Sequence, residues 1–185
     1  MAFNVNTFRQ EMKFDGARAN LFEVNLQFPF ELTNGGLNRD VTFKAKSAQI
    51  PGSTIGVVPV QYFGREVKFA GNRTFADWTV TILNDEDFAI RGAFEQWMNS
   101  INSHRENRRT LGAAPQSYTT DGSVKQYGKT GKVEREYAFK GLFPTDLSPI
   151  DLDWGNNDAI EEYTVTFSYQ WWEAINTNGK SVNIR

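Results

Sequence analysis

Apolar and polar residues alternate in several short segments of the chain, and the alternation predicts strands with one buried face. In residues 21–28, Phe22, Val24 and Leu26 fall on one face, while Glu23 and Asn25 fall on the other. A period of two is typical of a half-buried strand. The other segments with this period are residues 41–48, 57–62, 65–70, 75–83, 134–143 and 161–173.

Two turn signals predict how the early strands are joined. The run Asn34-Gly35-Gly36 lies between segments 21–28 and 41–48, which predicts a first hairpin. Phe63-Gly64 lies between segments 57–62 and 65–70, which predicts a second hairpin. Pro59 limits the first arm of this second hairpin to an edge position, because proline donates no ladder hydrogen bond.

The pattern changes to helical spacing after Asn84, so residues 84–103 are predicted to form a helix. Asn84 is the expected cap, and the carboxylates of residues 85–87 are expected in the first turn, where they offset the helix dipole. An apolar stripe predicts that the helix packs on the sheet; it consists of Ile90, Phe94, Trp97 and Ile101. A second, short helix or an arm is expected near the N-terminus and ends near Gly16, because Thr7 and Gln10 have capping-box spacing.

These elements predict a mainly β, α+β fold: a small antiparallel β-barrel or sandwich with one flanking helix. Residues 1–185 are interpreted as a single domain, with a long basic loop at 104–132 and a C-terminal extension at 174–185. The charge is uneven, because residues 141–175 contain seven acidic residues and no lysine or arginine.

Composition excludes several classes of function. The 185 residues include 14% aromatics, which is ample material for a packed core, and the net charge of −2 argues against a dedicated phosphate-backbone binder. With no cysteine in the chain, thiolate catalysis and cysteine-ligated zinc are impossible. The sequence shows neither an apolar signal region nor a membrane-spanning run, so we expect a protein that is made and kept in a cytoplasm.

No catalytic, cofactor or metal site is predicted. The segment from Gly122 to Thr130 resembles a phosphate loop, but its glycines are separated by five residues instead of four. The acidic segment 151–158 resembles a calcium loop, but Gly155 occupies a ligand position, so a turn is the expected structure. The single histidine, His104, is expected at the surface, and carboxylates 85–87 are explained by the helix start.

Four sequence blocks carry a family resemblance. The first is AGNRTFADWTVTILNDE at residues 70–86, and ANLFEV at 19–24 and KGLFPT at 140–145 follow the same order and spacing. The fourth is LDW at 152–154 together with EYTVTF at 162–167. These blocks resemble the tail-tube proteins of contractile-tailed phages over roughly residues 18–173.

The resemblance implies a structural protein, not an enzyme. It implies hexameric rings that stack into a hollow tube inside a contractile sheath, in a virion tail assembled in the host cytoplasm. The implied partners are other copies of the chain, the sheath protein, a tape-measure protein and baseplate or terminator proteins, with DNA passing through the bore without specific binding and with no membrane. Tube proteins of type VI secretion and phage-tail-like bacteriocins share this fold, so either machine is an alternative.

Two alternatives come from other classes of protein. One is a monomeric β-sandwich that binds nucleic acid through the basic loop, using Arg105, Arg108, Arg109, Lys125, Lys129 and Lys132. Salt-dependent DNA affinity of a monomer would favour it. The other is a hydrolase that uses the late acidic cluster, which has the weaker support.

The second hairpin is the candidate surface for stacking of rings. Residues 49–70 contain little core-facing material, so a protruding hairpin is expected. An aromatic anchor with charged neighbours is typical of contact surfaces; here the candidate residues are Gln61, Tyr62, Arg65 and Lys68. The alternative is an ordinary edge hairpin without a binding role.

Overall fold

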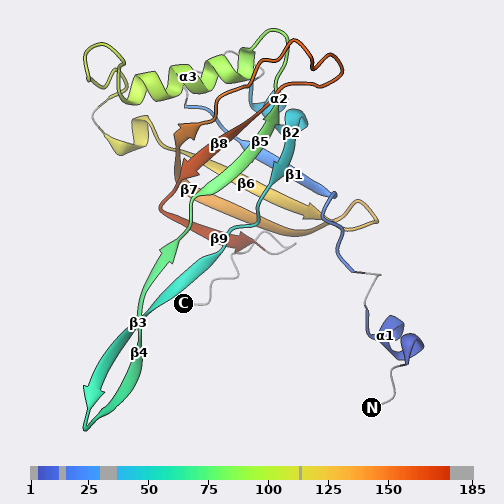
Figure 1. Cartoon of the computed structure of the whole chain (residues 1–185), viewed down its shortest axis with the longest axis vertical. Helices are drawn as coiled ribbons and strands as arrows, with labels where there is room; N and C mark the ends of the chain where they lie inside the picture. The colour runs from blue at the N-terminus through green and yellow to red at the C-terminus, as the bar shows by residue number, and fades with distance from the viewer. Residues whose placement is uncertain (1–3, 13–15, 30–36, 113, 176–185) are drawn as a thin grey trace.

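Two antiparallel sheets form the body of the protein, and they share one strand (Figure 1). The computed structural model describes residues 4–12, 16–29, 37–112 and 114–175. The first sheet contains β1 (Phe22–Leu26), β6 (Thr120–Tyr127), β7 (Val133–Leu147) and β9 (Trp171–Ile175). The second contains β7, β8 (Glu162–Ser168), β5 (Trp78–Leu83) and β2 (Ala45–Ala48). The predicted mainly β, α+β class is confirmed.

Strand β7 passes from one sheet into the other near Gly141. Residues before Gly141 pair with β6 and β9, and residues from Phe143 onward pair with β8. Gly141 has φ +66, and a Cβ at this position would lie 2.9 Å from the Gln170 side chain. Glycine is therefore required at this corner on both conformational and steric grounds.

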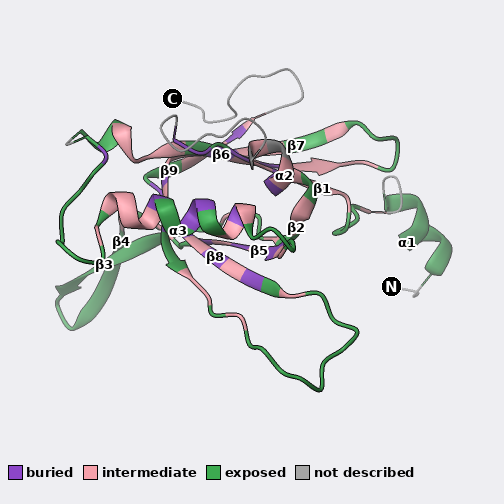
Figure 2. Cartoon of the chain, turned by 90° about the horizontal axis from the view of Figure 1, so that it is seen from above, coloured by how far each residue is buried: buried purple, intermediate pink, exposed green. Residues whose placement is uncertain are grey.

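The core lies between the sheets and beneath α3 (Ala89–Ile101). Ile90, Phe94 and Trp97 of α3 are buried, and Ile101 packs against the same cluster while partly exposed. The Phe94 ring lies 5.0 Å from the ring of Phe28, measured between centroids. The predicted packing of the helix stripe is confirmed, and Figure 2 shows buried positions recurring along α3.

The start of this helix was predicted wrongly. Asn84 extends the strand pairing instead of capping a helix: its N–H donates to the Glu161 carbonyl at 2.8 Å, and its side chain donates to the Glu161 carboxylate at 2.7 Å. The helix begins only after Phe88, which adopts φ +52, and its first turn contains no acidic residue. Because the helix starts at Ala89, the three carboxylates precede it. Asp85 instead forms an ion pair with Lys44.

The predicted strand at 41–48 is wrong in its first half, and the first hairpin does not form. Residues Leu37–Lys44 form helix α2, and only Ala45–Ala48 form strand β2. Val41 is completely buried while Phe43 is 75% exposed, which a shared strand face does not allow. Strand β1 pairs with β6 and β2 pairs with β5. The turn predicted at residues 34–36 lies outside the described residues.

Two later predictions also need correction. The predicted loop 104–132 contains a short 3₁₀ helix, η3 (Pro115–Ser117), and strand β6, in which Val124 is buried. Segment 161–173 is two strands, because the chain turns after β8 and Trp171 begins β9. The proposed extension therefore starts within β9, and residues 176–185 lie outside the described part of the chain.

The N-terminal helix exists, but its cap was assigned wrongly. Helix α1 spans Val5–Glu11, and the Asn4 side chain accepts a hydrogen bond from the Asn6 N–H at 3.0 Å. The cap is therefore Asn4 and not Thr7. Among the described residues, no helix is long and apolar enough to cross a membrane.

Candidate assembly surface

The second hairpin forms a separate two-stranded sheet that extends away from the body (Figure 1). It consists of β3 (Ser53–Tyr62) and β4 (Arg65–Phe75), so the predicted hairpin is confirmed and is longer than its predicted arms. Phe63 and Gly64 form the tip with φ +45 and φ +80. Every residue of β3 is exposed.

The register divides the four candidate residues between two faces of the hairpin. Tyr62 lies opposite Arg65, whereas Gln61 lies opposite Glu66 and Pro59 lies opposite Lys68. Directly opposed residues share a face, and successive residues alternate between faces. Tyr62 and Arg65 therefore lie on one face, and Gln61 and Lys68 lie on the other. The structure brings all four near the tip but not onto a single surface.

Beyond Arg65, the face that contains Tyr62 is apolar. By register it also presents two opposed pairs, Val58 with Phe69 and Val60 with Val67. These side chains are between 42% and 57% exposed, so nothing in the described part of the chain covers them. A contiguous exposed apolar stripe on a protruding element is typical of a protein contact surface. We call these four residues the apolar stripe.

Among the described residues, the charged side chains near the tip of the hairpin form a single ion pair. Lys68 forms an ion pair with Glu66 at 3.6 Å. Both lie on the face opposite Tyr62, which is polar near the tip and which we call the polar face. Arg65 forms no ion pair with any described residue. The Tyr62 ring packs edge-on against Phe63 at 4.6 Å between centroids. The tip thus presents two aromatic rings with a cation beside them.

The base of the hairpin, in contrast, is fixed to the body. The indole N–H of Trp78 donates to the Gln49 carbonyl at 2.9 Å, and the indole N–H of Trp172 donates to the Gly52 carbonyl at 3.2 Å. The Phe75 ring packs against the ring of Trp172 at 6.5 Å. The hairpin is therefore held at its base and exposed at its tip.

Sequence reasoning missed the tip residue Phe63 and the apolar stripe. Phe63 is 92% exposed, and the turn signal at residues 63–64 indicated only a turn there. The second arm has a sequence signal for the stripe, since Val67 and Phe69 alternate with Glu66, Lys68 and Ala70; in the first arm the signal is weaker, because Val57 and Pro59 flank Val58. The same signal predicts only that a face is apolar, not what covers it.

The other candidate residues, namely His104, the acidic segment 151–158 and the glycine-containing segment 122–130, do not come together in a site. His104 is exposed, and the acidic segment 151–158 lies on an exposed loop, where an Asp153 carboxylate oxygen accepts a hydrogen bond from the Gly155 N–H at 2.9 Å. Residues Gly122 to Thr130 belong to β6 and the turn that follows it. Within the described ranges, no group of three histidine or acidic side chains could hold a metal ion.

The protein thus combines a sandwich body with a protruding hairpin whose apolar face no described residue covers. Comparison with known proteins identifies the class further. The sequence matches the family model of the phage tail tube proteins over residues 17–175, which is most of the chain. The chain belongs to this family and is a tail tube protein of the contractile-phage type.

Individual relatives agree with this assignment. The chain is 36% identical to the tail tube protein gp19 of Enterobacteria phage T4 over 160 residues, covering 86% of this chain and 92% of the phage protein. It is 27% identical to a tail tube protein of Serratia phage KSP90 over 167 residues, covering 89% and 93%.

Solved structures show the same fold. A chain in the baseplate of the anti-feeding prophage matches with a TM-score of 0.62 at 13% identity, covering 88% of this chain and 97% of that chain. A chain in the sheath-tube complex of an extracellular contractile injection system matches with a TM-score of 0.59 at 15% identity, covering 95% and 99%. At these identities the likeness concerns the fold alone.

Proposed function

We propose that this chain assembles into hexameric rings, which stack into a hollow tube inside a contractile sheath. The role is structural, without catalysis. The observation that carries the proposal is the apolar stripe on the protruding hairpin, since a soluble monomer gains nothing by exposing it. Contact between copies removes this surface from water.

The hairpin is proposed to contact the next ring through its apolar face and tip. Its strands pair only with each other, so each leaves one edge unpaired within the described chain. Such an edge is satisfied when a neighbouring chain covers or pairs with it. Tyr62 and Arg65 belong to this contact face, whereas Gln61 and Lys68 belong to the polar face. The four candidates therefore have different proposed roles.

Passage of DNA through the bore is the proposed consequence of tube formation. Duplex DNA carries one charge per roughly 1.7 Å of its axis, so a bore rich in lysine or arginine would retain it. A net charge of −2 suits a polar to acidic bore. Sheath, tape-measure and baseplate or terminator proteins are the proposed partners, and the virion tail, assembled in the host cytoplasm, is the proposed location.

The phage tail is favoured over a secretion or bacteriocin machine, because the relatives above 30% identity are phage tail tube proteins. A nucleic-acid-binding module is disfavoured by the placement of its basic residues. Arg105, Arg108 and Arg109 follow α3, while Lys125 lies on β6 and binds the Glu23 carboxylate at 3.2 Å. Lys129 and Lys132 lie in the turn between β6 and β7, so the six basic residues are divided among three segments and do not form the single loop that this alternative needs.

A double substitution tests the stacking role. Tyr62→Ala with Arg65→Glu removes the tip aromatic and reverses the charge on the apolar face. The monomer is expected to fold normally, because both residues are exposed, while rings fail to elongate into tubes in negative-stain micrographs. The matched control, Gln61→Ala with Lys68→Glu, changes the opposite face of the same hairpin and should leave tube length nearly unchanged. Tubes of normal length from the first variant would refute the stacking role.

A further inference from the structure

The loop between β7 and β8 exposes large apolar side chains. Trp154 is 99% exposed, and Leu152 is 79% exposed. Figure 2 shows this loop running outward from the body as an exposed segment. An indole ring that is fully exposed to water leaves a large apolar surface uncovered in the monomer. Buried aromatic rings are among the side chains that contribute most to the binding energy of protein contacts. The composition of the loop is therefore typical of a segment that inserts an aromatic side chain into another protein surface.

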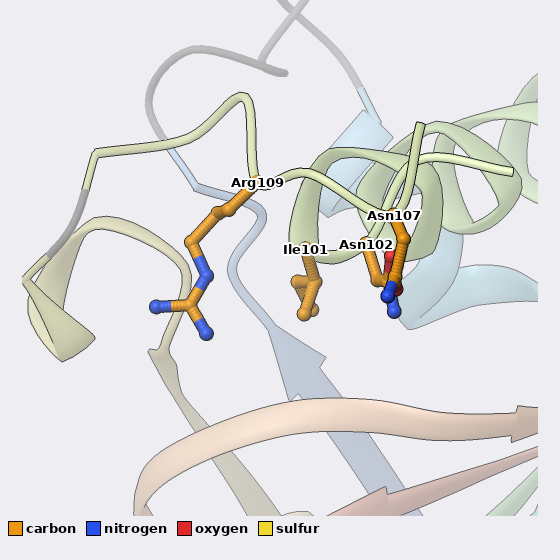
Figure 3. A pocket seen from close by; sticks show the side chains of 4 residues that line it. All are labelled: Ile101, Asn102, Asn107 and Arg109. Atoms are coloured by element: carbon orange, nitrogen blue, oxygen red, sulfur yellow. The ribbon is translucent and has the colours of Figure 1, made fainter. Parts of the chain in front are cut away.

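A hollow lies at the C-terminal end of α3. Its lining is Ile101, Asn102, Asn107 and Arg109. In Figure 3, Ile101 lies between Arg109 on one side and the two asparagines on the other. The wall thus combines an apolar floor, amide groups able to accept an indole N–H, and a guanidinium able to stack on an aromatic face.

The backbone that builds this hollow is fixed. The Ser103 N–H donates to the Arg108 carbonyl at 2.9 Å, which closes the loop after α3. Leu111 is buried beside it in the core. The Arg109 guanidinium already lies 4.4 Å above the centre of the Tyr118 ring. A ligand entering the hollow therefore meets a closed loop backbone and an Arg109 side chain that is already held in place.

The exposed loop and the hollow cannot meet within one chain. Figure 1 places the β7–β8 loop beside the N-terminal end of α3. The hollow is lined by Ile101 and Asn102, which lie at the other end of this helix. The Arg91 side chain donates to the Ser148 carbonyl at 3.2 Å, which fixes the start of the loop to the first turns of the helix. Thirteen helical residues separate the two ends by about 20 Å.

The two ends are also opposite in charge. The loop contains Asp151, Asp153 and Asp158, all exposed, in a stretch without lysine or arginine. The segment beside the hollow contains Arg105, Arg108 and Arg109, also exposed, and Glu106 is its only acidic residue. Arg105 forms no ion pair with any described residue. Opposite charges at the two ends favour head-to-tail contact between copies.

We infer that Trp154 of one copy docks into the hollow of Ile101, Asn102, Asn107 and Arg109 on the next copy within a ring. The inference rests on the proposed assembly into rings and identifies one of their lateral contacts. A head-to-tail contact between different patches generates a ring when the rotation closes, whereas a two-fold contact stops at a dimer. The acidic loop and the basic segment then lie around the anchor as a charged rim.

Truncation of the anchor is the first test. Trp154→Ala in the full chain should raise the critical concentration for ring assembly about tenfold, measured by sedimentation velocity. Near-ultraviolet circular dichroism should show an unchanged fold, because the ring lies in solvent. The matched control is Ile160→Ala, which removes an exposed apolar side chain at the base of the same loop and should leave assembly nearly unchanged.

Charge reversal tests which surfaces meet. Asp151→Lys with Asp158→Lys should weaken assembly, and so should Arg105→Glu with Arg108→Glu. All four substitutions in one chain should restore it, because each reversed loop then faces a reversed neighbour. Added salt should weaken wild-type assembly more than assembly of either charge variant. Failure of the combined variant to recover would overturn the assigned pairing.

Crosslinking separates failure of this contact from failure of ring assembly. Because the chain has no cysteine, Asn156→Cys with Glu106→Cys, two exposed positions that flank the anchor and the hollow and leave both intact, should give a ladder of covalent oligomers with a short bismaleimide. Asn156→Cys with Lys132→Cys is the distant control and should give no ladder. Wild-type rings without a ladder would overturn the contact alone. Wild-type protein that stays monomeric at every concentration, without a ladder, would overturn both the contact and the proposed function.

Discussion

Two strand pairs of this protein share a sequence pattern but differ completely in burial. In the β5–β8 pair, alternate apolar residues such as Val80 and Val165 are buried. In the β3–β4 pair, alternate apolar residues such as Val60 and Val67 are exposed. The body covers the first pair with its other sheet and α3, and no described residue covers the second. A period of two therefore predicts that a strand has an apolar face. Whether that face is covered within one chain depends on the elements that lie around the strand.

The sharpest test of this contrast compares the largest side chains of the two regions. Trp97 is completely buried, and its indole N–H donates to the Tyr118 carbonyl at 2.9 Å. Trp97→Ala should lower the free energy of unfolding by roughly 3–5 kcal/mol, because it leaves a cavity in the core. Phe63→Ala at the hairpin tip should change it by less than about 0.5 kcal/mol.

Chemical denaturation of the monomer measures both values. A loss below about 1 kcal/mol for Trp97→Ala would place the helix stripe at the surface and reject its packing. A large loss for Phe63→Ala would show that the tip contributes to the fold of its own chain. Either result would break the contrast between body and hairpin.

A substitution at Gly71 should disturb the hairpin while the body stays intact. A Cβ at Gly71 would lie 3.0 Å from the Gly56 carbonyl oxygen across the β3–β4 pair, at a bulge in the register. Gly71→Ala should cost about 1–3 kcal/mol locally, since a backbone atom must move. Hydrogen exchange of the β3–β4 amides should become about tenfold faster or more.

The matched control is Gly52→Ala, where no atom lies within 4 Å of the added Cβ. It should leave exchange in both regions nearly unchanged. If Gly71→Ala accelerated exchange equally in β5 and β8, the hairpin and the body would unfold together. The independence of the two regions would then be wrong.

The smallest expected effect concerns polar contacts. In the body, the Tyr127 hydroxyl donates to the Glu23 carboxylate at 2.6 Å across the β1–β6 pair. This hydrogen bond, with a smaller contribution from Lys125, lowers the pKa of Glu23. The same hydrogen bond, together with burial, raises the pKa of Tyr127 to about 12. In the hairpin, the Glu66–Lys68 pair joins residues of one strand and crosses to no neighbour. Tyr127→Phe should therefore cost about 1 kcal/mol, while Tyr62→Phe should cost almost nothing.

The cost of Tyr127→Phe should also depend on pH. The lowered pKa of Glu23 means that its contribution is present above the ordinary carboxyl value of 4.5 and is lost as pH falls below it. The raised pKa of Tyr127 means that its contribution is present below the ordinary value of 10 and is lost as pH rises toward 12. The difference in the free energy of unfolding between the wild-type protein and Tyr127→Phe should therefore be constant around neutral pH and fall at both lower and higher pH. A difference that stays constant from pH 3 to pH 8 would contradict this assignment.

The sequence predicted the elements whose apolar pattern matches their burial. Strand β5 and the stripe of α3 were predicted correctly because Trp78, Val80 and Phe94 are buried at the expected spacing. Strand β6 was missed because only Gly122 and Val124 are buried within it, too few to show a period. Its stability comes from hydrogen bonds to β1 and β7 on both sides, and these have no signature in its own sequence.

Helix α2 shows the opposite failure. Val41 and Phe43 alternate with polar residues, which favours a strand, but a five-residue alternation also occurs by chance. Contacts of α2 with β1 and α3 bury Val41 and decide the conformation. For the assembly surface, the turn signal predicted the hairpin, but the separation of Tyr62 from Gln61 onto different faces depends on which residues the partner strand places opposite them.

Strand β7 has a consequence for how the molecule comes apart. Because its two halves belong to different sheets, loss of its pairing with β8 also frees the strand on which β6 and β9 depend. The body then has no boundary along which half of it could melt alone. We expect one cooperative transition, in which fluorescence of the core tryptophans and circular dichroism of the strands change together. Such a subunit would either retain its complete shape under load or lose it entirely, without a partly opened intermediate that exposes its strands.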